Sequence, residues 1–242
     1  MTFVLLSLLA APAKEGSMQD SVTGSEPSRQ PPVPDAVRVQ ILATEHWSLL
    51  ATRSMAWNEL FVRTSMFITV LSATVVALAL VAQATDFGSN FRMFALLVLP
   101  VTLVLGIGTY IRLGDAMTED VWLVMGMNRL RHAYLDLAPD LEPYFLTGHH
   151  DDLAGIMQTR GPRPQMGPSR ILAATPTIVA IIDAVLVGVT LALLVGLLND
   201  HPAIAIAAGV VSAIATAVLL VGLIPRREIT RFSQSLKPRF QS

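Results

Sequence analysis

Four long apolar stretches, separated by polar ones, organise this chain. They span residues 65–84, 93–111, 172–198 and 203–224, and Asp183 is the one charged residue within them. Each stretch is close to the ~20 residues that a helix needs to cross about 30 Å of hydrocarbon. The pattern predicts an all-α integral membrane protein with four transmembrane helices in two hairpins and a layer of cytoplasmic helices.

The polar stretches divide the chain further. We expect a disordered N-terminal segment (1–34), a cytoplasmic helix (35–64) and a transmembrane hairpin (65–111). A cytoplasmic helical segment with a linker (112–170), a second transmembrane hairpin (171–224) and a basic cytoplasmic tail (225–242) should follow. Residues 21–34 are rich in Ser and Pro and cannot form a core. Residues 1–13 are apolar, but no positive charge precedes them, so we expect a dangling terminus or a start at Met18 rather than a signal peptide.

The first helix should begin at Asp35 and continue into the first span, since neither glycine nor proline occurs from residue 35 to 86. Residues at alternating steps of four and three form an apolar stripe along it: Ala43, Trp47, Leu50, Ser54, Trp57 and Phe61. Such spacing predicts a packing face, within the chain or between subunits. The alternative is a membrane-surface helix with Trp47 and Trp57 as interfacial anchors.

The segment 112–170 should form a second cytoplasmic helix that begins after an interruption at Gly114 and Asp115. Trp122 is one of its large apolar residues, and we expect it to pack together with Trp47 and Trp57. His132 and Asp136 are four residues apart and can pair. Pro139 should end this helix, with a further helical turn within residues 139–146.

Within the spans, Pro100 predicts a kink in the second helix. Small residues recur every four positions in the last two spans: Ala180, Ala184, Gly188, Ala192 and Gly196, then Ala205, Gly209, Ala213 and Ala217. Small residues at this spacing let helix backbones approach closely in a membrane. We therefore expect the third and fourth spans to be tight antiparallel neighbours.

Asp183 is the strongest candidate for a functional group, because an acid inside a span is costly unless it is paired, protonated or hydrated. Counted by depth, Ser72, Thr216 and two glycines of the second span, Gly106 and Gly108, lie at a similar level. One interpretation is a protonated acid that bonds a hydroxyl or a carbonyl group. The other is a proton or cation site within a pathway.

The cluster of His149, His150, Asp151 and Asp152 offers groups that can bind a divalent ion. Adjacent residues rarely all face one metal, so we favour a solvated turn that caps the next helix and predict neither a metal site nor a cofactor. Residues for nucleophilic or paired acid–base catalysis do not stand out, and we do not expect an enzyme. The basic residues form no dense patch with aromatics, which excludes a nucleic-acid partner.

The positive charges predict the topology. Of the 17 Lys and Arg residues, Arg92 is the one that falls in a loop within a predicted hairpin. Positive residues near the ends of spans stay in the cytoplasm. We expect a multi-pass protein of the plasma membrane with both termini and residues 112–170 in the cytoplasm.

Residues 129–152, RLRHAYLDLAPDLEPYFLTGHHDD, resemble a stretch found in an uncharacterised family of bacterial four-helix integral membrane proteins. The likeness covers roughly residues 35–157 and implies a bacterial source and the same order of helices. Residues 35–137 are also similar in layout to SLATT-type two-span effector domains, which are thought to perforate membranes in bacterial conflict systems. The second hairpin departs from that pattern.

The leading functional hypothesis is an oligomeric pore or ion-conducting protein. The alternative is a structural or regulatory membrane protein whose cytoplasmic helices recruit a protein partner. The expected partners are the lipid bilayer, further copies of the chain and, for the alternative, a cytoplasmic protein.

Overall fold

The computed structural model describes residues 33–161, 174–199, 201–225 and 237–241. The chain divides into two units, Met1–Pro34 and Asp35–Ser242. The expectations for residues 1–32, which include the disordered segment and the start at Met18, lie outside the described residues. All elements in the described ranges are helical, so the predicted all-α class is confirmed for them.

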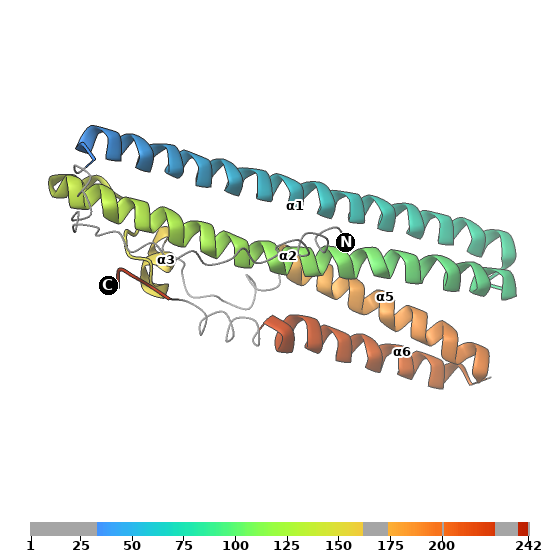
Figure 1. Cartoon of the computed structure of the whole chain (residues 1–242). Helices are drawn as coiled ribbons and strands as arrows, with labels where there is room; N and C mark the ends of the chain where they lie inside the picture. The colour runs from blue at the N-terminus through green and yellow to red at the C-terminus, as the bar shows by residue number, and fades with distance from the viewer. Residues whose placement is uncertain (1–32, 162–173, 200, 226–236, 242) are drawn as a thin grey trace, which may run out of the picture. The chain divides into compact units, whose positions relative to one another are not determined.

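Four helices of the second unit are long and apolar enough to cross a membrane, as predicted. They are the 51-residue α1 (Asp35–Thr85), the 49-residue α2 (Ser89–Leu137), α5 (Thr175–Leu198), and α6 (Pro202–Ala217), which continues as a π-helical turn, η2 (Val218–Leu223) (Figure 1). Two shorter elements complete the order: the 3-10 helix η1 (Pro139–Tyr144) and α3 (Leu153–Thr159).

The helices α1 and α2 are each much longer than a membrane span, because each joins an apolar half to a polar half without a break. The expected interruption at Gly114 is wrong, since α2 is helical throughout Ser89–Leu137. A helical glycine costs only about 1 kcal/mol relative to alanine, and its neighbours Leu113 and Ala116 are both buried in one cluster of the core. Their packing holds the helix together across Gly114. As predicted, α2 ends just before Pro139.

A tight turn joins α1 to α2. Asp86 and Phe87 have positive φ angles of 46° and 57°, and the amide of Gly88 donates to the carbonyl of Thr85 at 2.8 Å. A Cβ atom at Gly88 would lie 2.9 Å from that same carbonyl oxygen. Glycine therefore allows the chain to reverse within three residues.

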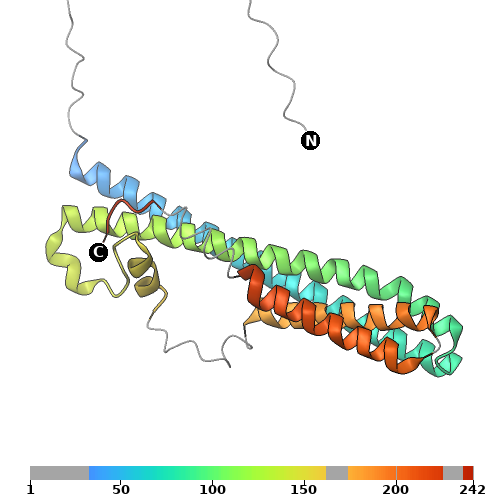
Figure 2. The ribbon, with the colours of Figure 1, turned by 90° about the horizontal axis from the view of Figure 1, so that it is seen from below.

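In the second unit, α1 packs on α2, α2 on α5, and α5 on α6. Figure 2 shows α5 and α6 running beside the part of α1 and α2 that contains their connection. Phe67, Leu113 and Val179 join the first three of these helices in one buried cluster, and Leu99 and Leu186 join α2 to α5 in another. We call this part the apolar bundle.

The small residues of α5 and α6 meet as their spacing predicted. A Cβ at Gly188 would lie 2.7 Å from the carbonyl oxygen of Gly209, and a Cβ at Gly209 would lie 2.8 Å from the Cβ of Ala192. The two backbones are in contact at these glycines, which leaves no room for a side chain.

The remaining part, the polar module, comprises the first half of α1, the second half of α2, η1, α3 and residues 237–241. Val124, Met125 and Ile156 form its buried cluster, against which Leu49 of α1 packs. The predicted stripe is not centred on the face that α1 turns toward α2, because Trp47 is 71% and Phe61 67% exposed, although Trp57 of the stripe does reach Asp120 of α2. The inward face is shifted around the helix and carries Leu49, Arg53 and Leu60, with Arg53 paired to α2.

Candidate functional sites

Asp183 lies at the centre of the apolar bundle. It is 0% exposed, and a Cβ built at Gly106 of α2 would overlap its carboxyl group. The same Cβ would lie 3.0 Å from Cε2 of Phe67 on α1. The absence of a side chain at Gly106 therefore creates the space that the acid occupies, with an aromatic ring beside it.

Neither carboxyl oxygen of Asp183 has a hydrogen-bond partner among the described residues. The predicted neighbours Ser72 and Thr216 do not supply one. Ser72 is exposed and donates to the carbonyl of Ile68 within its own helix at 2.8 Å, while Thr216 lies half-buried on α6. Of the residues predicted at this depth, the structure brings only Gly106 to Asp183.

The face of α2 that carries Gly106 also holds two polar contacts that the sequence did not indicate. Four residues before Gly106, the hydroxyl of Thr102 lies 3.0 Å from that of Thr74, and both residues are buried. Four residues after it, the hydroxyl of Tyr110 donates to the carbonyl of Leu220 in the π-helical turn at 2.5 Å. The acid thus lies between two satisfied polar pairs and is itself unsatisfied.

An unpartnered acid in an apolar setting is stable in its neutral form, because burial disfavours a charge that nothing compensates. Chemically, this site can hold and release a proton. It offers a metal ion a single carboxylate and, among the described residues, no further ligand.

A second buried acid, Asp120, lies in the polar module and is fully paired. It accepts hydrogen bonds from Nε of Arg53 at 2.6 Å, from a guanidinium nitrogen of Arg160 at 2.8 Å and from the indole of Trp57 at 3.3 Å. Burial alone would raise the pKa of Asp120, but the hydrogen bond and charge of Arg53, the charge of Arg160 and the bond from Trp57 together hold that pKa below its usual value. This group ties α1, α2 and the end of α3 together.

Asn128 organises the loop that precedes α3. It is 0% exposed, its amide donates to the carbonyl of His150 at 2.7 Å, and its oxygen accepts from Arg131 and Thr159, each at 2.7 Å. Every polar atom of this buried side chain has a partner, so the loop is held against α2 in one position.

The backbone of the loop is compact because two glycines meet. A Cβ at Gly148 would lie 2.5 Å from the carbonyl oxygen of Gly155, and a Cβ at Gly155 would overlap the backbone of His150. Asp152 then caps α3 by accepting from the amide of Gly155 at 2.8 Å. The interpretation of this stretch as a turn that caps a helix is therefore confirmed for Asp152.

Asp151, by contrast, faces residues 237–241, which we call the tail segment. Its carboxylate accepts from the amide of Phe240 at 2.7 Å and from that of Arg239 at 2.9 Å, and its own amide donates to the carbonyl of Phe240 at 3.1 Å. Nε of Arg129 donates to the same carboxylate at 2.6 Å. Burial tends to raise the pKa of Asp151, but the Arg239 amide, Arg129 and the Phe240 amide lower it below the usual range.

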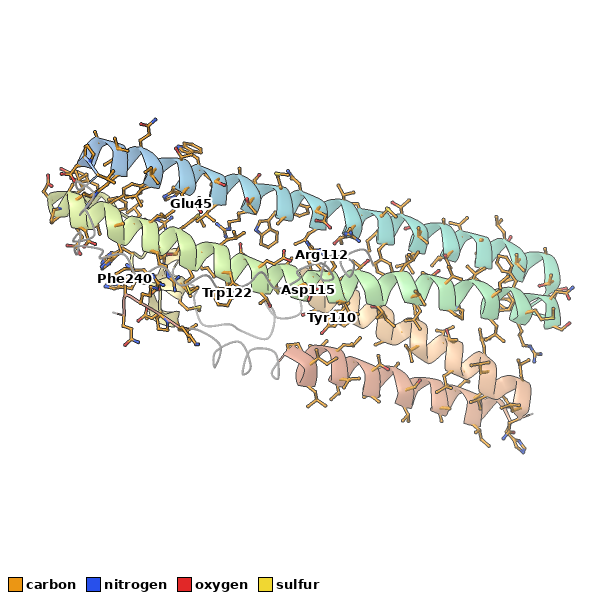
Figure 3. All side chains as sticks on the ribbon, viewed as in Figure 1. Glu45, Tyr110, Arg112, Asp115, Trp122 and Phe240 are labelled. Atoms are coloured by element: carbon orange, nitrogen blue, oxygen red, sulfur yellow. The ribbon has the colours of Figure 1, made fainter. Side chains whose placement is uncertain are left out.

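One histidine contacts the aromatic ring of the tail segment, and two more lie beside that histidine. Phe240 lies at the polar half of α2 (Figure 3), and its ring stacks on His132 with centroids 4.1 Å apart. The ring centroids of His149 and His150 each lie 6.1 Å from that of His132 and 4.2 Å from each other. His132 also lies 3.9 Å from Asp136, as the spacing of four predicted. Burial, followed by the charge of His150, lowers the pKa of His149.

These contacts engage the residues that a metal would need. In the described part of the chain, no group of three or more His, Cys, Asp or Glu side chains has a geometry that could hold a metal ion. Asp151 is committed to Arg129 and the tail segment, and Asp152 to the start of α3.

The three tryptophans differ in exposure and in their contacts. Trp47 is exposed on the outer side of α1, Trp57 donates to Asp120, and Trp122 is 44% exposed on α2. Met125, which follows Trp122 on α2, is buried in the core of the polar module.

Comparisons of the chain with models of protein families, with curated proteins and with solved structures found no match. The function is therefore inferred from the sites themselves.

Proposed function

We propose that this chain is a multi-pass membrane protein whose four apolar helices cross the bilayer, and that it conducts protons as an oligomer, with Asp183 as the group that binds the proton. The supporting observation is the carboxyl group of Asp183, which is fully buried and has no hydrogen-bond partner among the described residues. Ionisable groups within membrane helices commonly mark ion pathways and proton relays.

A proton fits this site better than a metal cation does. Metal cations such as Ca²⁺ and Mg²⁺ take six or more oxygen ligands, whereas a proton needs only the carboxylate. Gly106 and Phe67 surround the group with carbon atoms rather than oxygen. In the proposed oligomer, copies of the chain would pack through the exposed apolar side chains on the outer faces of the apolar bundle.

The proposed topology places both termini and the polar module in the cytoplasm, in the plasma membrane of a bacterium. The bias of positive charge toward the segments outside the paired spans supports this orientation. The polar module would then lie on the cytoplasmic side of the pathway that contains Asp183.

The test is proton flux into liposomes that contain the purified protein and a pH-sensitive dye, driven by a potassium diffusion potential. We expect flux for the wild type and at least a tenfold lower rate for Asp183→Asn, which keeps the shape of the side chain but cannot release a proton. Asp115→Asn, which alters an exposed acid of α2, is the matched control and should conduct like the wild type. Equal flux through Asp183→Asn, or none through the wild type, contradicts the proposal.

The second candidate is a regulatory or structural protein that recruits a soluble partner. The exposed apolar side chains on the outer side of the polar half of α1 favour it, since Trp47 is 71% and Met55 72% exposed. Apolar residues gathered on one exposed face are typical of protein-interaction surfaces.

A photo-reactive side chain in place of Trp47 distinguishes the two candidates. In the conducting oligomer, the photo-reactive residue should cross-link copies of the chain to each other or form no cross-link to another protein. In the regulatory protein, it should cross-link one soluble protein in cells, with no proton flux in liposomes.

A further inference from the structure

The tail segment is bound through its backbone and one ring. Asp151 bonds both the amide and the carbonyl of Phe240 as well as the amide of Arg239, and Arg129 donates to the carbonyl of Lys237 at 3.2 Å. The ring of Phe240 stacks on His132. Arg239 is exposed, so its side chain adds little to recognition.

This pattern defines a class of ligand. Two successive amides face one carboxylate, which requires a bend in the peptide backbone, as found at Arg239 and Phe240, and the residue of the second amide must carry an aromatic side chain. Main-chain bonds that supply affinity, with a side-chain contact that supplies selectivity, are typical of peptide-recognition sites. The bonds to the buried carboxylate are charge-assisted and hence strong.

The site is built from residues that are held independently of the tail segment. Arg129 bonds Asp151 directly, Asn128 bonds the carbonyl of His150, and the contact between Gly148 and Gly155 fixes the loop. None of these three contacts involves residues 237–241. The binding groups are therefore in place before the tail segment arrives, which lowers the cost of binding.

We propose that Asp151, Arg129 and His132 form an exchangeable peptide-binding site, with the tail segment of the same chain as its resident ligand. The ligand that enters in its place is the tail segment of a second copy of this chain, which presents the same aromatic residue and backbone groups. Exchange of tail segments links subunits through their polar modules, independently of any function of Asp183.

The first test uses a fluorescent peptide of residues 233–242 and full-length protein in nanodiscs. The Phe240→Pro protein lacks both the ring and the amide that occupy the site, so it should bind the peptide saturably. Wild-type protein should bind at least tenfold more weakly, because its own tail segment competes at a high effective concentration.

Changes to the peptide leave the protein intact and separate the contacts. N-methylation of the Phe240 amide, or Phe240→Ala, should each weaken binding about tenfold or more, as expected for loss of a charge-assisted bond or a stacked ring. The matched control is Gln241→Ala, at an exposed position of the tail segment, and it should bind normally. Equal binding of the N-methylated peptide, or no binding to a Phe240→Pro protein that melts like the wild type, overturns the proposal.

The second test examines exchange between copies. Full-length Phe240→Pro offers a vacant site and Asp151→Asn offers an unbound tail segment, so energy transfer between differently labelled copies should be greater in the mixture than within either variant alone. Equal transfer in all three samples overturns the assignment of a second copy as the competing ligand.

Discussion

The carboxyl group of Asp183 on α5 lies directly against the Cα of Gly106 on α2, in the space that any other residue at position 106 would fill. The distance between the two helices is therefore set by a pair with complementary shapes, a glycine and an acid. This relationship ties the chemistry of the acid to the packing of the bundle, and the two can be tested separately.

Gly106→Ala should destabilise the protein by about 1–3 kcal/mol, the usual cost of overfilling a packed core. The added methyl group would overlap Asp183 and press on Phe67. Gly108→Ala is the matched control, since a Cβ there meets nothing within 4 Å, and it should be neutral or slightly stabilising. Thermal unfolding in detergent measures both, and recovery of stability in the double variant Gly106→Ala/Asp183→Ala would identify the acid as the cause.

Gly188→Ala should separate α5 from α6, because its methyl group would lie 2.7 Å from the carbonyl oxygen of Gly209 and 2.8 Å from the Cβ of Ala213. We expect a loss of about 1–3 kcal/mol in unfolding free energy. Gly196→Ala, whose Cβ would make an ordinary 3.8 Å contact with Ala205, should behave like the wild type. Equal loss in both variants would show that the contact at Gly188 is not the cause, since alanine by itself favours a helix over glycine.

The stability of the polar module should fall with pH below about 6.5. Burial and the charge of His150, opposed by Glu142, lower the pKa of His149 from 6.5. A histidine whose pKa is lowered by folding contributes stability that is full above pH 6.5 and is lost as the pH falls through the lowered value. The midpoint of thermal unfolding should therefore drop on acidification, and the drop should be smaller in His149→Gln.

The control for that experiment is His201→Gln, which alters an exposed histidine in the connection between α5 and α6. It should leave the pH dependence unchanged. A profile that is the same for His149→Gln and the wild type would show that His149 does not carry the effect.

The proposed topology can be tested by labelling, because the chain contains no cysteine. In whole cells, an impermeant thiol reagent should modify Ser89→Cys, at the start of α2, and should not modify Ser169→Cys or Ser235→Cys. Permeabilised cells provide the control, since all three should then react. The reverse pattern in whole cells would invert the orientation of the spans.

Hydropathy was sufficient to predict the helical class and the four long apolar helices, because each stretch carries its own signal in consecutive residues. The contact between Gly188 and Gly209 was also predictable, since small residues at steps of four mark the surfaces where helices approach. The end of α2 before Pro139 likewise depends on local chemistry alone.

Long-range pairing explains what the sequence did not reveal. The inward face of α1 follows from Arg53, whose partner Asp120 is 67 positions away. The prediction of a solvated turn is wrong for Asp151, which is fully buried, because the amides that it binds are 88 and 89 positions further along the chain. Depth alone placed Ser72 and Thr216 near Asp183, but depth does not determine which way a side chain faces around its helix.

The uninterrupted course of α1 gives the chain a fixed angular register. Each residue of an α-helix turns the chain by about 100° and advances it by about 1.5 Å. One residue inserted into α1 between Arg53 and Phe67 would rotate one of these side chains about 100° away from its partners on α2 and α5, while seven inserted residues would change their relative direction by only about 20°. The length of this helix can therefore vary only by nearly whole numbers of turns, such as about 7 or about 11 residues, and only together with a matching change in α2.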